Sequence, residues 1–152
     1  MLAKPQIDFY ILKDGGLQGR LRIFAKLCHK VYTGNHKGYI HCDDRETMEQ
    51  LDNFLWTFHD IAFIPHSTLG SKAATKAPLL LGHSNAPPFH QTEENSPSDY
   101  LLINMAMVVP DFFKHFIRVI EIIPSQEPQR QQGRTRYQHY KNQGFLVNTH
   151  DL

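Results

Sequence analysis

Apolar side chains along this chain gather in short β-branched or aromatic runs, and between several runs they recur at helical spacing. The runs are bounded by turn residues and predict strands at 7–12, 37–42, 62–65, 78–82, 99–104 and 118–123. The helical spacing predicts a helix over 18–32, a second that Asp43 opens in a capping box with Glu46, and a short aromatic helix over 110–116. This alternation predicts an α/β fold: a three-layer, mostly parallel twisted sheet with helices on both faces.

A final helix is predicted from about residue 126 to residue 143. Pro128 suits a first helical turn, and Gly144 suits the position after a helix end. Helical spacing puts four side chains in one stripe: Arg130, Arg134, Tyr137 and Lys141. The segment has a fourth cation, Arg136, and no Asp or Glu between residues 129 and 144. Paired hydrogen bonds from arginine suit an acidic partner, although a solvated basic helix face would show the same spacing.

Length and composition narrow the class of protein. A chain of 152 residues predicts one domain spanning 1–152, with a proline-rich exposed loop at 84–98. The net charge of +1 argues against a general nucleic-acid binder, since the basic charge is local to the last helix. Cys28 and Cys42 lie in apolar segments and are expected to be buried, reduced thiols of a cytoplasmic protein. No apolar run approaches the length of a membrane span, so no membrane association is expected.

The usual signatures of catalysis and cofactor binding are missing from the sequence. After the first predicted strand there is no G-x-G-x-x-G spacing, and Gly70-Ser71-Lys72 lacks the upstream glycine of a Walker loop. His41, Cys42 and His83 fall at strand ends where they could converge, but a hydrogen-bonded strand-end histidine is commoner than a metal ligand. Helix capping explains Asp43 and Asp44. The sequence therefore predicts no catalytic site, no metal and no cofactor.

Short fragments over nearly the whole chain occur in an order typical of one protein family. They are Asp-Phe-Tyr-Ile-Leu at 8–12, Cys-Asp-Asp at 42–44, the Leu-Asp-x-x-Leu-Trp segment at 51–56, Phe-Ile-Pro-His at 63–66, and the Arg-x-Arg-Tyr-x-x-Tyr-x-x-x-Gly-Phe segment at 134–145. Together they resemble the chi subunit of bacterial DNA polymerase III. The resemblance implies a nucleotide-binding-like topology without a phosphate loop, in an accessory subunit that has no catalytic site of its own.

The resemblance also implies partners and the residues that meet them. Chi-type proteins join the clamp-loader complex through the psi subunit and bind the acidic C-terminal tail of single-stranded-DNA-binding protein. A helicase that competes with psi is a further expected partner, and contact with DNA is mostly indirect. By this resemblance the tail-binding positions are Ile123, Arg130, Arg134 and Tyr137, and the psi-type interface includes Trp56 and Phe63. Burial in the core is the alternative for Trp56, which ends the apolar face of the second helix.

The chain departs from the family pattern at three places. Gln138 stands where a lysine is common, the 84–98 loop is unlike the family's basic, serine-rich loop, and Gly133 is expected to weaken the last helix by about 1 kcal/mol relative to alanine. Two other functions remain as alternatives. One is an α/β nucleotide-binding enzyme, which the missing glycine loop disfavours. The other is a module that binds DNA directly through the basic helix, for which steep salt dependence would be the sign.

Overall fold

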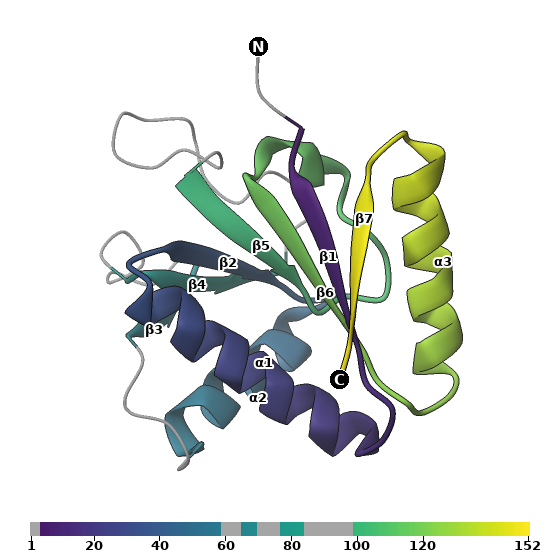
Figure 1. The fold of residues 1–152 in the computed structure, drawn as a ribbon. Helices are drawn as coiled ribbons and strands as arrows, with labels where there is room; N and C mark the ends of the chain where they lie inside the picture. The colour runs from purple at the N-terminus through teal and green to yellow at the C-terminus, as the bar shows by residue number, and fades with distance from the viewer. Residues whose placement is uncertain (1–3, 59–64, 70–76, 84–98) are drawn as a thin grey trace.

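A single parallel sheet organises the chain (Figure 1). The computed structural model describes residues 4–58, 65–69, 77–83 and 99–152. Within these residues the sheet has seven strands, in the order β3-β4-β2-β5-β6-β1-β7. Every adjacent pair runs parallel. The strands are β1 (Gln6–Ile11), β2 (Lys37–His41), β3 (His66–Thr68), β4 (Leu79–Gly82), β5 (Tyr100–Asn104), β6 (Arg118–Ile123) and β7 (Val147–Asp151).

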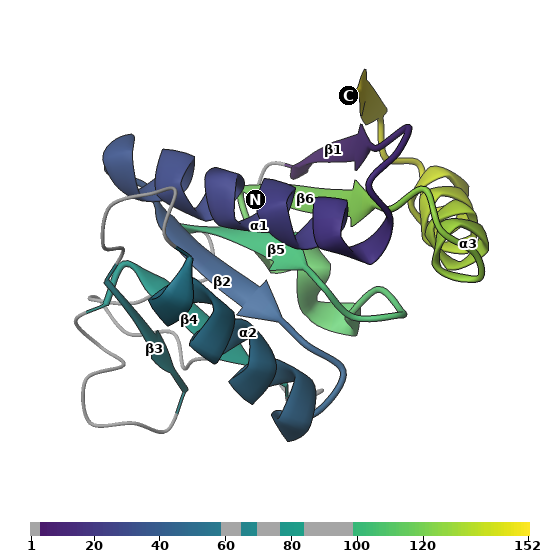
Figure 2. The ribbon, with the colours of Figure 1, turned by 90° about the horizontal axis from the view of Figure 1, so that it is seen from below.

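Helices cover both faces of the sheet, so the predicted three-layer α/β fold is confirmed (Figures 1 and 2). On one face, α1 (Gly16–Thr33) and α2 (Arg45–Thr57) pack over a cluster that includes Phe24, Ile40 and Ile103. On the other face, α3 (Gln129–Asn142) and the short 3₁₀ helix η2 (Asp111–His115) pack over a cluster that includes Phe9 and Tyr140. No helix in the described part of the chain is long and apolar enough to cross a bilayer.

The two strands that end the sheet differ from the sequence prediction. β3 spans His66–Thr68, between the predicted strands at 62–65 and 78–82, and β7 follows α3, where no strand was predicted. The predicted strand at 62–65 lies mostly outside the described residues, as does the 84–98 loop. Both missed strands sit at an edge of the sheet. An edge strand pairs with a neighbour on one side only, and its other side meets solvent, so it needs no apolar run. A polar segment such as His-Ser-Thr therefore lacks the alternation of apolar and polar residues that predicts a strand.

The predicted helix boundaries are right to within a few residues, but one cap is wrong. Asp44, not Asp43, is the N-cap of α2, and its carboxylate accepts a hydrogen bond from the Thr47 backbone N–H at 2.8 Å. Asp43 instead accepts from the backbone N–H of Met107 at 2.8 Å, which ties the end of β2 to the loop after β5. α3 begins at Gln129 rather than near 126, with Pro128 as its N-cap residue.

The predicted end of α3 is confirmed in detail. Gly144 has a φ of 84°, in the left-handed region that glycine tolerates best. Its N–H donates to the Lys141 carbonyl at 3.0 Å, and the Phe145 N–H donates to the Tyr140 carbonyl at 3.2 Å. This pair of bonds is a Schellman motif, and Phe145 completes it by packing with Tyr140 in the core cluster under α3. The chain then turns directly into β7.

Gly133 lies where α3 makes its closest approach to the sheet. A Cβ atom on Gly133 would sit 2.5 Å from Cδ1 of Ile123 and 3.0 Å from its Cγ2. Gly133 is therefore more than a weak point in the helix. Glycine costs helix propensity, but it is the residue that lets α3 rest on β6 at this distance.

The polar groups that end β2 are buried. His41 is 3% exposed, its Nδ1 lies 3.1 Å from the Tyr39 hydroxyl, and its ring meets Phe112 edge-on at 5.3 Å. Burial lowers the pKa of His41 to about 4, with Asp43 opposing and His83 assisting the shift. Cys28 and Cys42 are free and buried as expected, and burial raises the pKa of both thiols. These groups therefore stay uncharged at neutral pH.

Substitution of Gly133 tests the close approach of α3. We expect Gly133→Ala to lower the free energy of unfolding, because overpacking costs of about 1–3 kcal/mol outweigh the gain of about 1 kcal/mol in helix propensity. Ile123→Val removes the Cδ1 atom, so Gly133→Ala should be less harmful in that background. Urea unfolding of both single variants and the double variant measures the coupling. Strictly additive effects would contradict the close contact.

The buried imidazole of His41 predicts a pH dependence of stability. Its folded pKa of about 4 is below the unfolded value of 6.5. Between these values the unfolded chain binds the extra proton, so the contribution of His41 to stability falls as pH drops from about 6.5 to about 4 and changes no further below that. Urea unfolding across this range should show that the loss is smaller in His41→Gln than in the wild type. His29→Gln, on half-exposed α1 surface, is the control, and parallel curves for His41→Gln and wild type would reject the assignment.

Candidate functional site

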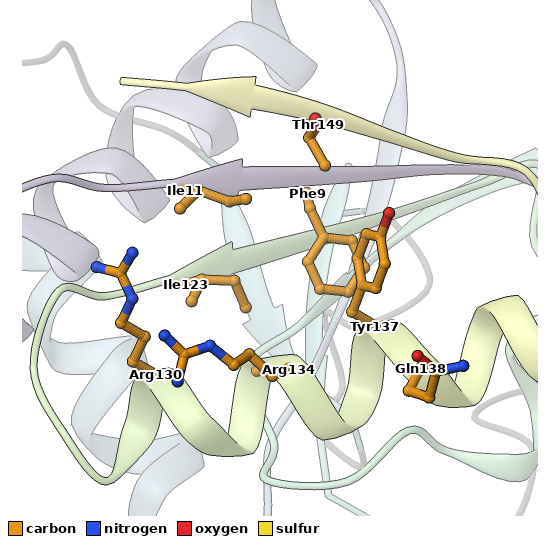
Figure 3. Close-up of a pocket in the computed structure, with 9 residues that line it drawn as sticks. Phe9, Ile11, Ile123, Arg130, Arg134, Tyr137, Gln138 and Thr149 are labelled. Atoms are coloured by element: carbon orange, nitrogen blue, oxygen red, sulfur yellow. The ribbon is translucent and has the colours of Figure 1, made fainter.

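A groove lies between α3 and strands β1, β6 and β7 (Figure 3). We call it the α3 groove; its volume is about 350 Å³. Its lining residues are Phe9, Ile11, Ile123, Arg130, Gly133, Arg134, Tyr137, Gln138 and Thr149. Three of the four predicted tail-binding positions come from one helix and the fourth from β6, and the structure brings all four together.

The floor of the groove is apolar and aromatic. Phe9 and Ile11 are two residues apart on β1, so both side chains lie on the face of the sheet that α3 covers. There they lie next to Ile123 on β6. The Tyr137 ring meets the Phe9 ring edge-on at 5.3 Å, and Tyr137 is only partly buried. Edge-to-face packing of this kind holds both rings in place. An aromatic or aliphatic side chain entering the groove would therefore meet a preformed apolar surface.

The rim of the groove is positively charged. Arg130 is half-buried and Arg134 is exposed, and Figure 3 shows both guanidinium groups on the side of α3 that borders the groove. Arg134 Nη1 donates to the Gln131 side chain at 3.0 Å. Within the described residues no carboxylate lies within 4.0 Å of either guanidinium. Both charges are thus available to an acidic ligand, in a fork geometry that matches carboxylate.

The other two cations of α3 lie elsewhere. Lys141 Nζ sits 5.7 Å from the centre of the Tyr137 ring, in cation–π contact, so it extends the stripe beyond the groove. Arg136 is 4% exposed and is paired with Glu121 at 2.9 Å. The sequence counted Arg136 among the cations of this segment but did not place it in the stripe. It lies two residues from Arg134, which turns it to another side of α3.

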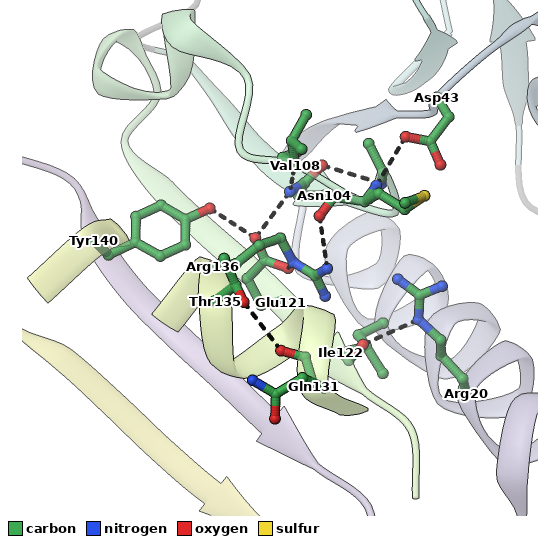
Figure 4. A network of polar contacts seen from close by, with 12 residues as sticks. Arg20, Asp43, Asn104, Val108, Glu121, Ile122, Gln131, Thr135, Arg136 and Tyr140 are labelled. Carbon is green, nitrogen blue, oxygen red and sulfur yellow. Dashed lines mark hydrogen bonds and ion pairs between the residues drawn. The ribbon is translucent and has the colours of Figure 1, made fainter. Parts of the chain in front are cut away.

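Glu121 is the centre of a buried polar network (Figure 4). Its carboxylate accepts hydrogen bonds from Arg136 Nε at 2.9 Å, Asn104 Nδ2 at 2.9 Å and the Tyr140 hydroxyl at 2.7 Å. Arg136 Nη1 also donates to the Met107 carbonyl at 3.0 Å. Burial, and then the charge of Glu121, raise the pKa of Tyr140 well above its usual value. The network fixes the rotation of α3 and so points Arg130, Arg134 and Tyr137 toward the groove.

Sequence reasoning missed the strand residues of the α3 groove. The sequence predicted Phe9 and Ile11 only as parts of a buried strand. Thr149 belongs to an edge strand without an apolar pattern. Glu121 did carry a signal, because it is the one acidic residue in the run Arg-Val-Ile-Glu-Ile-Ile of β6. A charge in a strand that is apolar on both sides needs a buried partner, and α3 supplies it.

The second predicted surface is at the end of α2. Trp56 is 52% exposed and its ring centre lies 4.4 Å from that of His66. His66 is buried, with Nε2 3.3 Å from the Asp52 carboxylate. Core burial, the alternative for Trp56, is therefore excluded, and a large aromatic face is presented to solvent. Phe63, the other predicted position, lies outside the described residues.

Within the part of the chain that the structure describes, no three His, Cys, Asp or Glu side chains form a group that could hold a metal ion. His41 and Cys42 are packed into the core, whereas His83 is exposed at the end of β4. The suggested convergence of these three residues on a metal has no support in the geometry.

Comparisons with known proteins give matches over nearly the whole chain. Residues 5–148 match the family described as DNA polymerase III chi subunit, HolC. A curated relative, DNA polymerase III subunit chi of Pseudomonas aeruginosa, is 32% identical over 147 residues, which covers 97% of this chain and 96% of the relative. The subunit of the same name from Escherichia coli is 26% identical over 145 residues, which covers 93% of this chain and 94% of the relative. The one from Haemophilus influenzae is 24% identical over 145 residues, which covers 95% of this chain and 96% of the relative.

These matches confirm the resemblance predicted from sequence fragments, and they extend from β1 into β7. The fold agrees with the sequence-based expectation of a parallel α/β sheet covered on both faces. The chain therefore belongs to the DNA polymerase III chi subunit family.

Proposed function

We propose that this protein is a non-catalytic adaptor of the replicative polymerase, working in the cytoplasm. It joins the clamp-loader complex, through a psi subunit, to the acidic C-terminal tail of single-stranded-DNA-binding protein. The observation that carries the proposal is the α3 groove, where an apolar floor lies beside two guanidinium groups without carboxylate partners among the described residues. An acidic peptide that ends in an apolar side chain has the complementary chemistry.

Each part of the groove has a role in this recognition. Ile123 and Tyr137 take the apolar side chain at the end of the peptide, next to Phe9 on the floor. Arg134 grips a carboxylate through two parallel hydrogen bonds, and Arg130 meets a second acidic group. Because Arg134 is exposed, its contribution falls as salt is added. Gln138 replaces a lysine at the groove margin and so removes one possible charge contact.

Trp56 supplies the second surface of the adaptor. An exposed tryptophan held against a buried histidine is rigid and amphipathic, the type of residue that anchors protein interfaces. The psi subunit is the expected partner here, and a helicase that uses the same surface would compete with it. The α2 surface and the α3 groove lie on opposite faces of the sheet, so both partners can bind at once.

The tail site is tested first at Arg134. Charge-assisted hydrogen bonds are worth about 1.5–3 kcal/mol each, so Arg134→Ala should weaken binding of a tail peptide by roughly tenfold to a hundredfold. Arg134→Lys should recover only part of the affinity, because an ammonium group cannot reproduce the fork. The measurement is calorimetric titration at two salt concentrations, with the full peptide and with one that lacks its last residue.

Arg22→Ala is the matched control, because Arg22 is exposed on α1 and its loss changes the net charge equally. It should leave the affinity unchanged. Unchanged affinity in Arg134→Ala, with helical content preserved by circular dichroism, would place the tail site elsewhere.

The psi-type surface is tested at Trp56. Trp56→Ala should abolish heterodimer formation with a psi subunit, since a hot-spot aromatic is typically worth about 2 kcal/mol or more. The thermal midpoint should change little, because the side chain is already 52% exposed. Tyr32→Ala on α1 serves as the control, because Tyr32 is 37% exposed. A Trp56→Ala protein that still co-elutes with psi would remove this residue from the interface.

A further inference from the structure

A second cavity opens where the strands end, on the other side of α3 from the groove. We call it the carboxyl-edge cavity; its volume is about 450 Å³. Asp43 follows β2, Met105 to Met107 follow β5, and Pro124 follows β6, and all of them line it. After β2 the chain passes through α2 on one face of the sheet, and after β5 it passes through η2 on the other. β2 and β5 are neighbours, so their connections diverge and leave a crevice, the place where open α/β sheets take ligands.

Two arginines from different helices meet in this cavity. Arg20 comes from α1 and Arg136 from α3, and Figure 4 shows their guanidinium groups turned toward each other. Arg20 donates only its Nε, to the Ile122 carbonyl at 3.0 Å. Arg136 uses Nε and Nη1, for Glu121 and the Met107 carbonyl. Within the described chain, both terminal nitrogens of Arg20 and Nη2 of Arg136 have no hydrogen-bond partner in the protein.

The charges around Arg20 are only partly balanced. No described carboxylate lies within 4.0 Å of its guanidinium. Burial and then the nearby charge of Arg136 lower the pKa of Arg20 to about 10, although Glu121 and Asp43 oppose the shift. The Glu121 carboxylate already accepts hydrogen bonds from Arg136, Asn104 and Tyr140. An anion placed between the two guanidinium groups would relieve this repulsion.

Amide side chains complete the polar wall. Gln50, Gln129 and Gln132 line the cavity. Gln129 Oε1 is buried without a hydrogen-bond partner, which is a rare and costly arrangement. The amide NH₂ groups of Gln50 and Gln132 are hydrogen-bond donors of the kind that an anionic ligand requires.

An apolar groove continues from the carboxyl-edge cavity between α1 and α2. The extension has a volume of about 310 Å³ and adds Leu21, Leu51 and Phe54. The residues that line both are Leu17, Arg20, Thr47, Gln50 and Met105. Phe54 is half-buried, so one part of its ring faces the groove. A ligand held at the arginines would therefore have room and an aromatic surface for an uncharged organic group.

We propose that the carboxyl-edge cavity binds a phosphomonoester with a small aromatic group, of the nucleoside monophosphate class. Arg20 and Arg136 hold the phosphate, and the groove along Leu21 and Phe54 holds the organic part. A phosphate presents three oxygens and two negative charges, which suits two guanidinium groups from separate helices; a carboxylate suits a single fork. A single phosphate also fits a chain without the glycine-rich loop that cradles a pyrophosphate. This binding is independent of the α3 groove.

The test is titration of the 152-residue chain with inorganic phosphate, a nucleoside 5′-monophosphate and the unphosphorylated nucleoside, followed by calorimetry and amide chemical shifts. The monophosphate should bind most tightly and the nucleoside least. Arg20→Gln should weaken monophosphate binding by about tenfold or more, since charge-assisted hydrogen bonds are lost. Arg22→Gln, the exposed neighbour on α1, should bind like the wild type.

A second variant, which is expected to bind the monophosphate more tightly, separates an effect on the cavity from a loss of folding. Asp43→Asn keeps an oxygen to accept the Met107 N–H but removes a negative charge that lines the cavity. It should bind the monophosphate about twofold to tenfold more tightly. No saturable binding at millimolar monophosphate, equal loss in Arg22→Gln and Arg20→Gln, or weaker binding in Asp43→Asn would each overturn the proposal. Equal affinity for phosphate and monophosphate would reject the role of the apolar groove.

Discussion

The arrangement of both cavities depends on the hydrogen bonds that the buried carboxylate of Glu121 accepts. A buried carboxylate is costly unless its oxygens are fully hydrogen-bonded, and here donors from β5 and α3 meet it. The bonds from Arg136 and Tyr140 are one helical turn apart, so together they set both the position and the rotation of α3. With that rotation, one side of the helix presents Arg130 and Arg134 to the α3 groove, and another side presents Arg136 to the carboxyl-edge cavity.

This division shows why a count of charges describes a helix poorly. Four cations in one segment suggest a uniformly basic surface, yet they occupy three environments. Arg136 neutralises a core carboxylate, Lys141 rests on the Tyr137 ring, and Arg130 and Arg134 remain for a ligand. What a partner meets is the pair of arginines beside an apolar floor. Spatial selectivity of this kind suits protein recognition, where charge sets orientation and the apolar contact supplies most of the affinity.

Much of the fold was predictable because its physical signals are local. The apolar run of β6 and the helical spacing before Gly34 mark elements whose burial is decided by their own residues. The helix end at Gly144 is equally local, since glycine there adopts a positive φ. The edge strands β3 and β7 were missed because pairing with one neighbour, not their own composition, makes them strands. The α3 groove was half-predicted: helix spacing identified Arg130, Arg134 and Tyr137, whereas Phe9 and Thr149 reach it only through the sheet topology.

The contact between Gly133 and Ile123 has a consequence for how this family can change over evolutionary time. The depth of the α3 groove depends on how close the helix lies to β6, and that distance depends on the absence of a side chain at position 133. A relative that acquires alanine or a larger residue there must either accept a smaller residue at position 123 or move its helix outward. Positions 133 and 123 should therefore covary among homologous chains, and each accepted pair would give the groove a different width and so a different preference for the side chain that enters it.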